Sequence, residues 1–316
     1  MRPEISIDQC QLYKCRSKKR LAEILYLERA DLDEIPAWAK YRIGHLEKDD
    51  GSTRVIYSPC KKLKTVQKRI KRLLERIRKP SWVFSGTKGK CHVDNAMHHA
   101  GNTYFVLSDI ARFYESCTRD AVYKFFLDKM ETSPDVAGLL ADITTLETEG
   151  KTVIPTGSPS GQLLAFFSYK EMFDELEELA SRHGCRLSLY VDDLTISSNT
   201  PIANPKNLQK QLARIMASYG HSIKWSKTRY AKPSEFKVVT GVAIGPDGEP
   251  HIPNNLGREI IGGLQDALGG DCLSQASTLG RINAARQIVE GSFPEVERVL
   301  CDDRRCSPQD IHGQIP

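Results

Sequence analysis

Apolar and polar residues follow two different periods along this chain, and each period predicts a different kind of element. Helices are predicted where apolar residues recur at gaps of three and four. These segments are 61–79, 119–147, 162–183, 205–219 and 255–300, the last with a break at Gly269-Gly270. Most of 1–50 is also expected to be helical, whereas the polar segment 81–102 is expected to be loop.

Short apolar runs predict the strands. One buried strand is expected over 104–110, and it contains Asp109. Two further runs flank Asp192 and Asp193, which predicts a β-hairpin with this acidic pair at its tip. Further strands are expected over 55–57 and 222–229, and a further hairpin over 238–252 with its turn at 245–248.

The order of these elements predicts the fold class. Strand, helices, hairpin, helix and strand follow one another in a βαββαβ-like core. Such a core is an α+β fold, in which an antiparallel sheet carries helices on one face. A loop rich in Gly, Pro and Ser, 154–161, separates two of the helices, and the polar residues from Asp302 on are expected to be loose.

Composition adds the setting in which this fold is expected to work. The chain has 316 residues, 40% hydrophobic and 27% charged, and lacks both a long apolar run and the apolar core of a signal peptide. We therefore expect a cytoplasmic protein with no membrane contact. The nine cysteines form no CxxC pair, so free thiols are expected rather than a zinc site.

The charge distribution is more informative than the net charge of +5. Ten Lys and Arg residues lie within 61–79, and only Glu75 opposes them. The apolar residues of the same segment share one helical face, so the other face is strongly basic. A solvated surface is the simple explanation, but a face of one sign favours an anion beside it, and we expect nucleic-acid phosphate.

Three carboxylates carry the candidate chemistry. Asp109 lies in one predicted strand, and Asp192 and Asp193 lie on a hairpin 83 residues later. Acidic pairs at turns are mostly structural, but apolar strands flank this pair, and buried like charges are costly unless a cation compensates them. Carboxylates that meet on one sheet suit Mg²⁺, and two such ions could support nucleotidyl transfer.

These residues also match a known family. The Tyr190-Val191-Asp192-Asp193 segment resembles the YxDD signature of reverse transcriptases, and Asp109 matches the first catalytic aspartate of their palm domain. Three further segments resemble the fingers, the nucleotide-binding loop and the lysine-containing segment of that family. They are Arg54-Val55-Ile56-Tyr57-Ser58-Pro59, Ile154-Pro155-Thr156-Gly157-Ser158-Pro159-Ser160 and Ser226-Lys227-Thr228.

Two more motifs are typical of the retron branch of the family. Asn95-Ala96-Met97-His98-His99 resembles its NAxxH motif, and Val239-Thr240-Gly241 resembles its VTG triplet. The resemblance covers roughly residues 40 to 290. Two positions depart from it, because retron enzymes usually carry Ala where Val191 stands and Gln where Thr156 stands.

The resemblance implies a right-hand polymerase with fingers, palm and helical thumb. The implied domains are an N-terminal helical extension (1–40), interleaved fingers and palm (41–250), and a thumb with a C-terminal tail (251–316). It also implies two Mg²⁺ ions, held by Asp109, Ile110, Asp192 and Asp193.

Roles for further residues follow from the same resemblance. The residues expected at the nucleotide are Arg54, Tyr114, Thr156, Gly157 and Lys227. The residues expected at the RNA are Lys64, Lys68, Asn95, His99 and Arg281. Simpler roles stay open: a core aromatic for Tyr114, a solvated charge for Lys227, and a structural role for the histidine and the asparagine.

Retron enzymes copy part of a bound structured noncoding RNA into single-stranded DNA, using dNTPs, and leave a branched RNA–DNA product. By resemblance we expect this activity here, together with anti-phage defence and a separate effector protein. An enzyme of the group II intron or diversity-generating kind is an alternative, although 316 residues leave little room for a maturase region. A non-catalytic RNA-binding scaffold or antitoxin is the alternative from another class.

Overall fold

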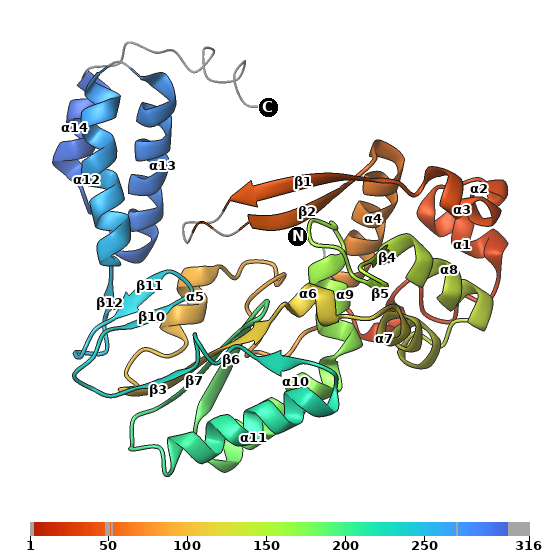
Figure 1. Ribbon diagram of the computed structural model, residues 1–316, viewed down its shortest axis with the longest axis horizontal. Helices are drawn as coiled ribbons and strands as arrows, with labels where there is room; N and C mark the ends of the chain where they lie inside the picture. Colours follow the sequence, from red (N-terminus) through yellow and green to blue (C-terminus); the bar gives the residue numbers. More distant parts are fainter. Residues whose placement is uncertain (1–2, 48–50, 52, 270, 303–316) are drawn as a thin grey trace. The chain divides into compact units, whose positions relative to one another are not determined.

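The computed structural model describes all of the chain except residues 1–2, 48–50, 52, 270 and 303–316 (Figure 1). The prediction of a loose tail therefore lies almost wholly outside the described residues. The chain divides into two compact units built from interleaved segments. Unit 1 comprises Met1–Lys90, Ser108–Leu194 and Ala203–Thr228, and unit 2 comprises Cys91–Leu107, Thr195–Ile202 and Arg229–Pro316.

The central sheet has the strand order β6-β7-β3-β8, with β9 also paired to β3. Its strands are β3 Tyr104–Ala111, β6 Arg186–Tyr190, β7 Asp193–Ser198, β8 Ser222–Ile223 and β9 Arg229–Ala231. Both β8 and β9 run antiparallel to β3. Phe105, Val106 and Ile110 on β3 are buried, which confirms the buried strand expected around Asp109.

Helices of unit 1 cover one face of this sheet (Figure 1). Helix α10 Lys170–Arg182 contacts β6, and α11 Pro205–Ser218 contacts β8. Their apolar stripes are buried, as the helical period predicts. The antiparallel sheet with helices on one face confirms the predicted α+β class.

The helix expected over 162–183 is two helices, α9 Gly161–Ser168 and α10. They meet at Tyr169, whose hydroxyl donates to the Ser116 carbonyl at 3.1 Å and accepts from the Thr118 N–H at 3.1 Å. These bonds hold Tyr169 against the end of α6 Phe113–Ser116 and the residues that follow it, and the helix is interrupted at Tyr169. Helical periodicity alone did not reveal this break, because both helices bury apolar faces.

The helix expected over 119–147 is also interrupted. It consists of α7 Arg119–Lys124, the π-helical turn η2 Phe125–Lys129 and α8 Pro134–Thr144. Glu131 has a left-handed φ of 51°, and Pro134 begins the new helix. The last part of the predicted helix lies instead in the hairpin of β4 Leu146–Thr148 and β5 Lys151–Val153.

The N-terminal segment is helical only to residue 38. Its helices are η1 Ile7–Gln9, α1 Lys18–Leu25, α2 Arg29–Asp33 and α3 Ile35–Trp38. The expectation of helix was wrong for 41–47, because β1 Tyr41–Glu47 pairs antiparallel with β2 Thr53–Pro59 along its whole length, and residues 48–50 lie outside the described residues. Helix α4 Lys61–Leu74 follows β2 and buries its apolar face, as predicted, but it ends at Leu74 rather than at residue 79.

Unit 2 combines a small sheet with three helices. The sheet runs β10 Lys237–Val239, β11 Val242–Ile244 and β12 Pro250–His251. The expected hairpin with its turn at 245–248 is formed by β11 and β12, and β10 adds a third strand through a second turn. Helices α12 Asn254–Leu268, α13 Cys272–Ile288 and α14 Pro294–Asp302 pack against one another, as the pattern over 255–300 predicts. Their shared core contains Ile260, Ile282 and Leu300.

One helix of unit 2 lies where loop was expected. Helix α5 His92–Met97 contacts β11. It begins at a polar cap that periodicity cannot detect, because the Asp94 carboxylate accepts from the Cys91 N–H at 2.6 Å.

The structure also bears on two expectations from composition, the one on membrane spans and the one on cysteines. No helix among the described residues is long and apolar enough to span a membrane. Six cysteines among the described residues are free thiols: Cys10, Cys15, Cys60, Cys91, Cys117 and Cys185. Cys272 is disulfide-bonded, so the expectation of free thiols was wrong for this residue.

Candidate active site

The acidic pair lies at the turn between β6 and β7, as the two flanking apolar runs predict. Val191 at this turn has a φ of 61°, which is unfavourable for a β-branched residue. Its N–H donates to the Ser85 hydroxyl at 2.8 Å. This bond, together with the two strands, holds the turn in its strained shape.

Asp109 lies beside this turn. Strand β3 is the neighbour of β7, and the Ile110 N–H donates to the Asp192 carbonyl at 3.1 Å. The Asp109 side chain is 5% exposed. Burial raises the pKa of Asp193 to about 6, and the charges of Asp192 and Asp109 act in the same direction. The structure therefore brings the three predicted carboxylates together.

Lys227 is the cation of this acidic group. Its amino group donates to the Asp109 carboxylate at 2.6 Å, and this hydrogen bond raises the pKa of Lys227. The segment that carries Lys227 is held by the Lys224 N–H, which donates to the Asp109 carbonyl at 2.8 Å. The predicted lysine thus forms an ion pair with Asp109, although its side chain is 56% exposed.

The carboxylates of the site are of the type that binds a hard divalent cation, but their present arrangement forms no metal site among the described residues. Among the described residues, no three or more His, Cys, Asp or Glu side chains converge in the way that a bound metal requires, and Lys227 holds one of the carboxylates. Burial and then the charge of Asp109 raise the pKa of Asp192, so its charged form is disfavoured unless a cation compensates it. Carboxylate oxygens in such a place are the ligands that Mg²⁺ prefers.

Tyr114 and Arg54 lie near the acidic pair. Burial and then the negative charge of Asp192 raise the pKa of the Tyr114 hydroxyl well above its usual range. Arg54 extends from β2 and is exposed, and its charge opposes the rise in the pKa of both Tyr114 and Asp192. The Tyr114 hydroxyl and the Arg54 guanidinium therefore lie close enough to Asp192 to interact with it electrostatically.

The loop before α9 is docked on β2. The Tyr57 N–H donates to the Thr156 carbonyl at 2.8 Å. Gly157 has a φ of 102°, and a Cβ there would stand 2.8 Å from the Tyr57 carbonyl oxygen. Only glycine tolerates this conformation and this close approach. Thr156 and Gly157 are thereby fixed beside the strand that carries Arg54.

A buried glutamine secures the same loop. The Ser158 hydroxyl donates to the Gln67 side-chain oxygen at 3.1 Å. The Gln67 amide donates in turn to the Tyr41 hydroxyl at 2.6 Å and to the Ile143 carbonyl at 2.9 Å. Helix α4, strand β1 and the loop thus form one hydrogen-bonded support for the site.

The comparisons with known proteins agree with this geometry. Residues 46–244 match the model of the reverse transcriptase (RNA-dependent DNA polymerase) family. This match covers more than half of the chain. The chain belongs to the reverse transcriptase family. Membership implies the right-hand polymerase fold, so the predicted fold class and the predicted resemblance are both confirmed.

Retron enzymes are among the similar proteins. The Retron Se72 reverse transcriptase of Salmonella heidelberg is 29% identical over 76% of this chain and 64% of its own length. The Retron Ec48 reverse transcriptase of Escherichia coli is 25% identical over 72% of this chain and 58% of its own length. The chain thus spans less than two thirds of the length of these reverse transcriptases. An apo telomerase structure from Candida tropicalis, truncated from its C-terminal domain, has a TM-score of 0.49 at 13% identity and covers 69% of this chain and 55% of its own.

The residues predicted to bind RNA fall into two groups in this reverse transcriptase. Lys64 and Lys68 are exposed on the basic face of α4. Arg281 is partly exposed, and its guanidinium donates to Glu259 at 3.1 Å. Asn95 and His99 are buried, at 1% and 0% exposed, which favours the structural role over direct RNA contact.

The two retron motifs meet in unit 2. The Asn95 amide donates to the Thr240 hydroxyl at 3.2 Å, and this hydroxyl donates to the His92 carbonyl at 2.9 Å. Thr240 has a φ of 46° and Gly241 a φ of 82°, as in a type I′ turn. The NAxxH helix therefore holds the VTG turn, and the two hydrogen bonds explain why a threonine is tolerated there.

His99 makes a second such link in unit 2. Its ring nitrogen Nδ1 lies 2.6 Å from the Ser197 hydroxyl oxygen, and the Asn102 amide donates to the same hydroxyl at 2.7 Å. His99 thereby connects the segment after α5 to strand β7. The spacing of the motif predicts none of these partners, because they lie about a hundred residues away.

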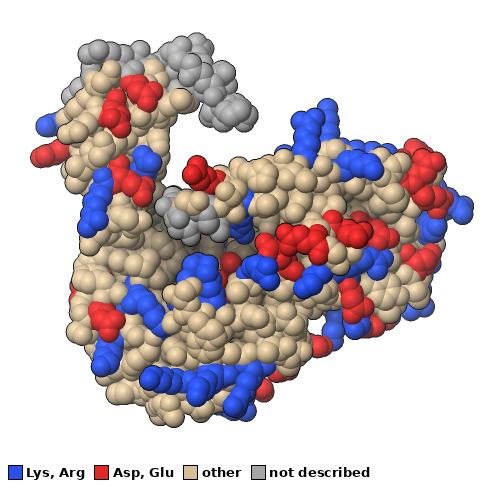
Figure 2. All heavy atoms as spheres, viewed as in Figure 1, with Lys and Arg blue, Asp and Glu red and all other residues tan. Residues whose placement is uncertain are grey.

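A further row of cations was not predicted. Lys206, Lys210 and Arg214 are exposed on α11. Figure 2 shows basic side chains gathered over this helix at the lower edge of the view. Their spacing of four residues places them on one face of the helix, which the sequence could have indicated. The residues between them include apolar ones, so the segment does not stand out as a basic run.

Proposed function

We propose that this chain is an RNA-directed DNA polymerase of the retron type, which copies part of a bound structured noncoding RNA into single-stranded DNA. The observation that supports it most is the position of Asp109 beside the Asp192-Asp193 turn. A scaffold that only bound RNA would have no need of three neighbouring carboxylates, whose like charges repel one another.

Asp109, Asp192, Asp193 and the backbone of Ile110 would hold two Mg²⁺ ions. When bound, such ions neutralise charge on the phosphates and activate the attacking 3′-hydroxyl. The chain's own residues would bind and orient the substrates. Lys227 donates to Asp109 at 2.6 Å, and from there its charge would help to neutralise the departing pyrophosphate.

The incoming deoxynucleotide would lie between β2 and Tyr114. The guanidinium of Arg54 suits the triphosphate, since it donates to phosphate oxygens in a fixed fork. The buried ring of Tyr114 would exclude a ribose 2′-hydroxyl by its bulk. The docked loop with Thr156 and Gly157 would contact the base pair that forms, because glycine allows the backbone to approach closely.

The partner of this enzyme would be a structured RNA, bound first through phosphate. Lys64 and Lys68 on α4 would contact it, and Arg281 would do so from the thumb. Basic helices read an A-form duplex through phosphates and 2′-hydroxyls. We further propose a branched RNA–DNA product, a separate effector protein, and a role in cytoplasmic anti-phage defence, as for the retron enzymes that the sequence resembles.

Purification from the native host tests this function. We expect a discrete single-stranded DNA to copurify with the chain, to survive RNase treatment and to be complementary to a copurifying RNA. A chain that brings down RNA but no DNA, and that cannot extend a strand with deoxynucleotides and Mg²⁺, would be a scaffold instead.

A further inference from the structure

The edge strand of the small sheet in unit 2 exposes apolar side chains to solvent and buries a charged one. On and beside β10, Phe236 and Val238 are 55% and 50% exposed, whereas Lys237 between them is fully buried. The Lys237 amino group donates to the Pro233 carbonyl at 3.0 Å and lies 5.7 Å from the centre of the Phe105 ring. A charged side chain is thus inside and two apolar ones are outside.

A shift of one residue would reverse this arrangement. Neighbouring side chains of a strand point to opposite faces, so the shift would bury Phe236 and Val238 and expose Lys237. The structure does not take that register. Val239 and Val242 pack in the core of unit 2, and the turn between them is held to α5 by the hydrogen bonds of Thr240. The retron motifs therefore fix a register that keeps two apolar side chains in solvent.

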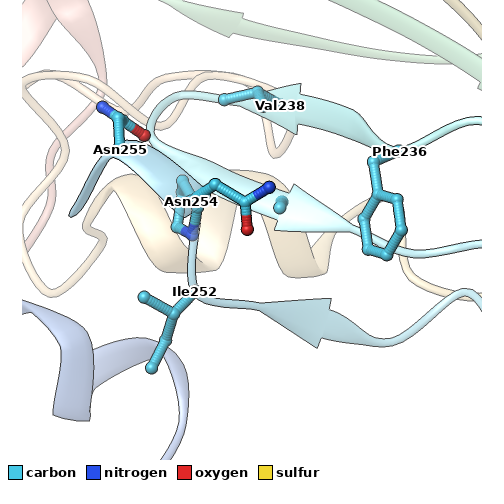
Figure 3. Close-up of a pocket in the computed structure, with 7 residues that line it drawn as sticks. Phe236, Val238, Ile252, Asn254 and Asn255 are labelled. Atoms are coloured by element: carbon cyan, nitrogen blue, oxygen red, sulfur yellow. The ribbon is translucent and has the colours of Figure 1, made fainter. Parts of the chain in front are cut away.

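The exposed side chains line a pocket of about 300 Å³. Its other walls come from β11, the segment before α12, and the first residues of α12. The lining residues are Phe236, Val238, Ala243, Ile252, Pro253, Asn254 and Asn255. Figure 3 shows the amide of Asn254 reaching toward the ring of Phe236. The pocket thus combines an aromatic face, an apolar floor and an amide at its rim.

Charged residues of both signs lie in the segments that border this pocket. Arg229 donates to the Phe236 carbonyl at 3.4 Å and forms an ion pair with Glu235 at 3.8 Å. Lys232 is exposed in the same segment, and Arg258 is exposed one helical turn after Asn254. The ring of Phe236 is steadied by His251, whose ring centre lies 5.5 Å away at an angle of 78°.

We propose that this pocket, lined by Phe236 and Asn254, binds an unpaired base of the RNA. The proposal rests on the RNA-dependent function proposed above. An unpaired base offers a flat face that stacks on an aromatic ring. Its polar edges can both accept hydrogen bonds from an amide and donate hydrogen bonds to it. Its phosphates would lie against the exposed Lys232 and Arg258 of the bordering segments, and an apolar protein segment would have no such charges to offer them.

Substitutions that separate an aromatic face from mere apolar bulk test this site. Phe236→Leu keeps an apolar side chain but removes the ring, whereas Phe236→Tyr keeps the ring. For the RNA that copurifies with the wild-type chain, we expect Phe236→Leu to weaken binding about tenfold and Phe236→Tyr to bind like the wild type. Leu273→Ala, an exposed apolar site on α13 outside the pocket, is the matched control and should not change affinity.

Ultraviolet crosslinking of the wild-type complex adds a direct readout. We expect a nucleotide adduct on the peptide that contains Phe236. The proposal is overturned if the adducts all lie elsewhere, or if both Phe236 variants bind the RNA like the wild type. It is also overturned if Phe236→Leu leaves RNA binding intact but abolishes association with a protein or with a second copy of the chain. Failure of the polymerase function is recognised separately, since the wild-type chain would then make no DNA in the same preparation.

Discussion

Replacing Asp193 by asparagine is expected to stabilise the protein while abolishing its activity. The carboxylate of Asp193 is mostly buried and lies beside two other carboxylates, which together raise its pKa from 3.8 to about 6. A raised pKa means that the folded state disfavours the charged form. The charge of Asp193 therefore destabilises the fold at neutral pH, and an uncharged amide of the same shape relieves that cost.

The rise in pKa sets the size of this effect. At about 1.4 kcal/mol per pH unit, a rise from 3.8 to about 6 corresponds to up to about 3 kcal/mol in the free energy of unfolding. The sign follows from linkage. Above pH 6 both states of the wild type are charged at this residue, and the full cost applies. As the pH falls from 6 to 3.8 the folded state takes up its proton first, so the advantage of Asp193→Asn disappears.

Urea unfolding followed by tryptophan fluorescence measures this difference in unit 1. All three tryptophans, Trp38, Trp82 and Trp225, belong to that unit. The measurement is made with a chelator present, so that bound cations do not offset the charge. Asp128→Asn, at an exposed carboxylate on η2, is the control and should change stability by less than about 0.5 kcal/mol. If Asp193→Asn is no more stable than the wild type at pH 7, or if its advantage persists at pH 4, the electrostatic account of the site is wrong.

Three further predictions concern the surroundings of the site. Replacing Tyr114 by valine should raise the incorporation of ribonucleotides about tenfold or more, measured against deoxynucleotides, because it removes the ring that we propose excludes the 2′-hydroxyl; unchanged discrimination would mean a plain core residue. Burial lowers the pKa of His221 to about 4, so stability should fall by up to about 3 kcal/mol as the pH drops from 6.5 to 4, since only the unfolded state binds the proton. His221→Phe should lose that part of the pH dependence in the same urea assay, and a variant with the wild-type slope would contradict it. Gly157→Ala should destabilise unit 1 by about 1–3 kcal/mol, because its Cβ would meet the Tyr57 carbonyl oxygen at 2.8 Å with φ at 102°; a neutral result in thermal unfolding would show that the loop can move away from β2.

Much of the site could be predicted because its signals are local. The apolar runs on both sides of Asp192 and Asp193 predict the hairpin and its tip, and the run over 104–110 predicts the buried strand with Asp109. The basic face of α4 follows from helical spacing alone. That Asp109 meets the hairpin is a question of strand order, which the resemblance implied and the pairing of β3 beside β7 confirmed.

The expectations that failed depend on contacts between distant residues. Nothing near Tyr169 indicates that its hydroxyl bonds to Ser116 and Thr118 and divides a helix. The segment 41–47 is a strand because β2 pairs with it, although the helical prediction extended through it. The burial of Lys237 and the exposure of Phe236 reverse the usual preference, and they follow from a turn fixed by Asn95, far away in the sequence.

Strand extension by carboxylate variants is the most direct test of the central claim, that Asp109 and the Asp192-Asp193 turn act together on a primer end. The purified chain with its copurifying RNA, deoxynucleotides and Mg²⁺ is compared with Asp109→Asn and Asp192→Asn. We predict that the wild type extends a DNA strand templated by the RNA, and that each variant stays folded and RNA-bound but extends at least about a hundredfold more slowly. Folded variants that extend at the wild-type rate would contradict the claim.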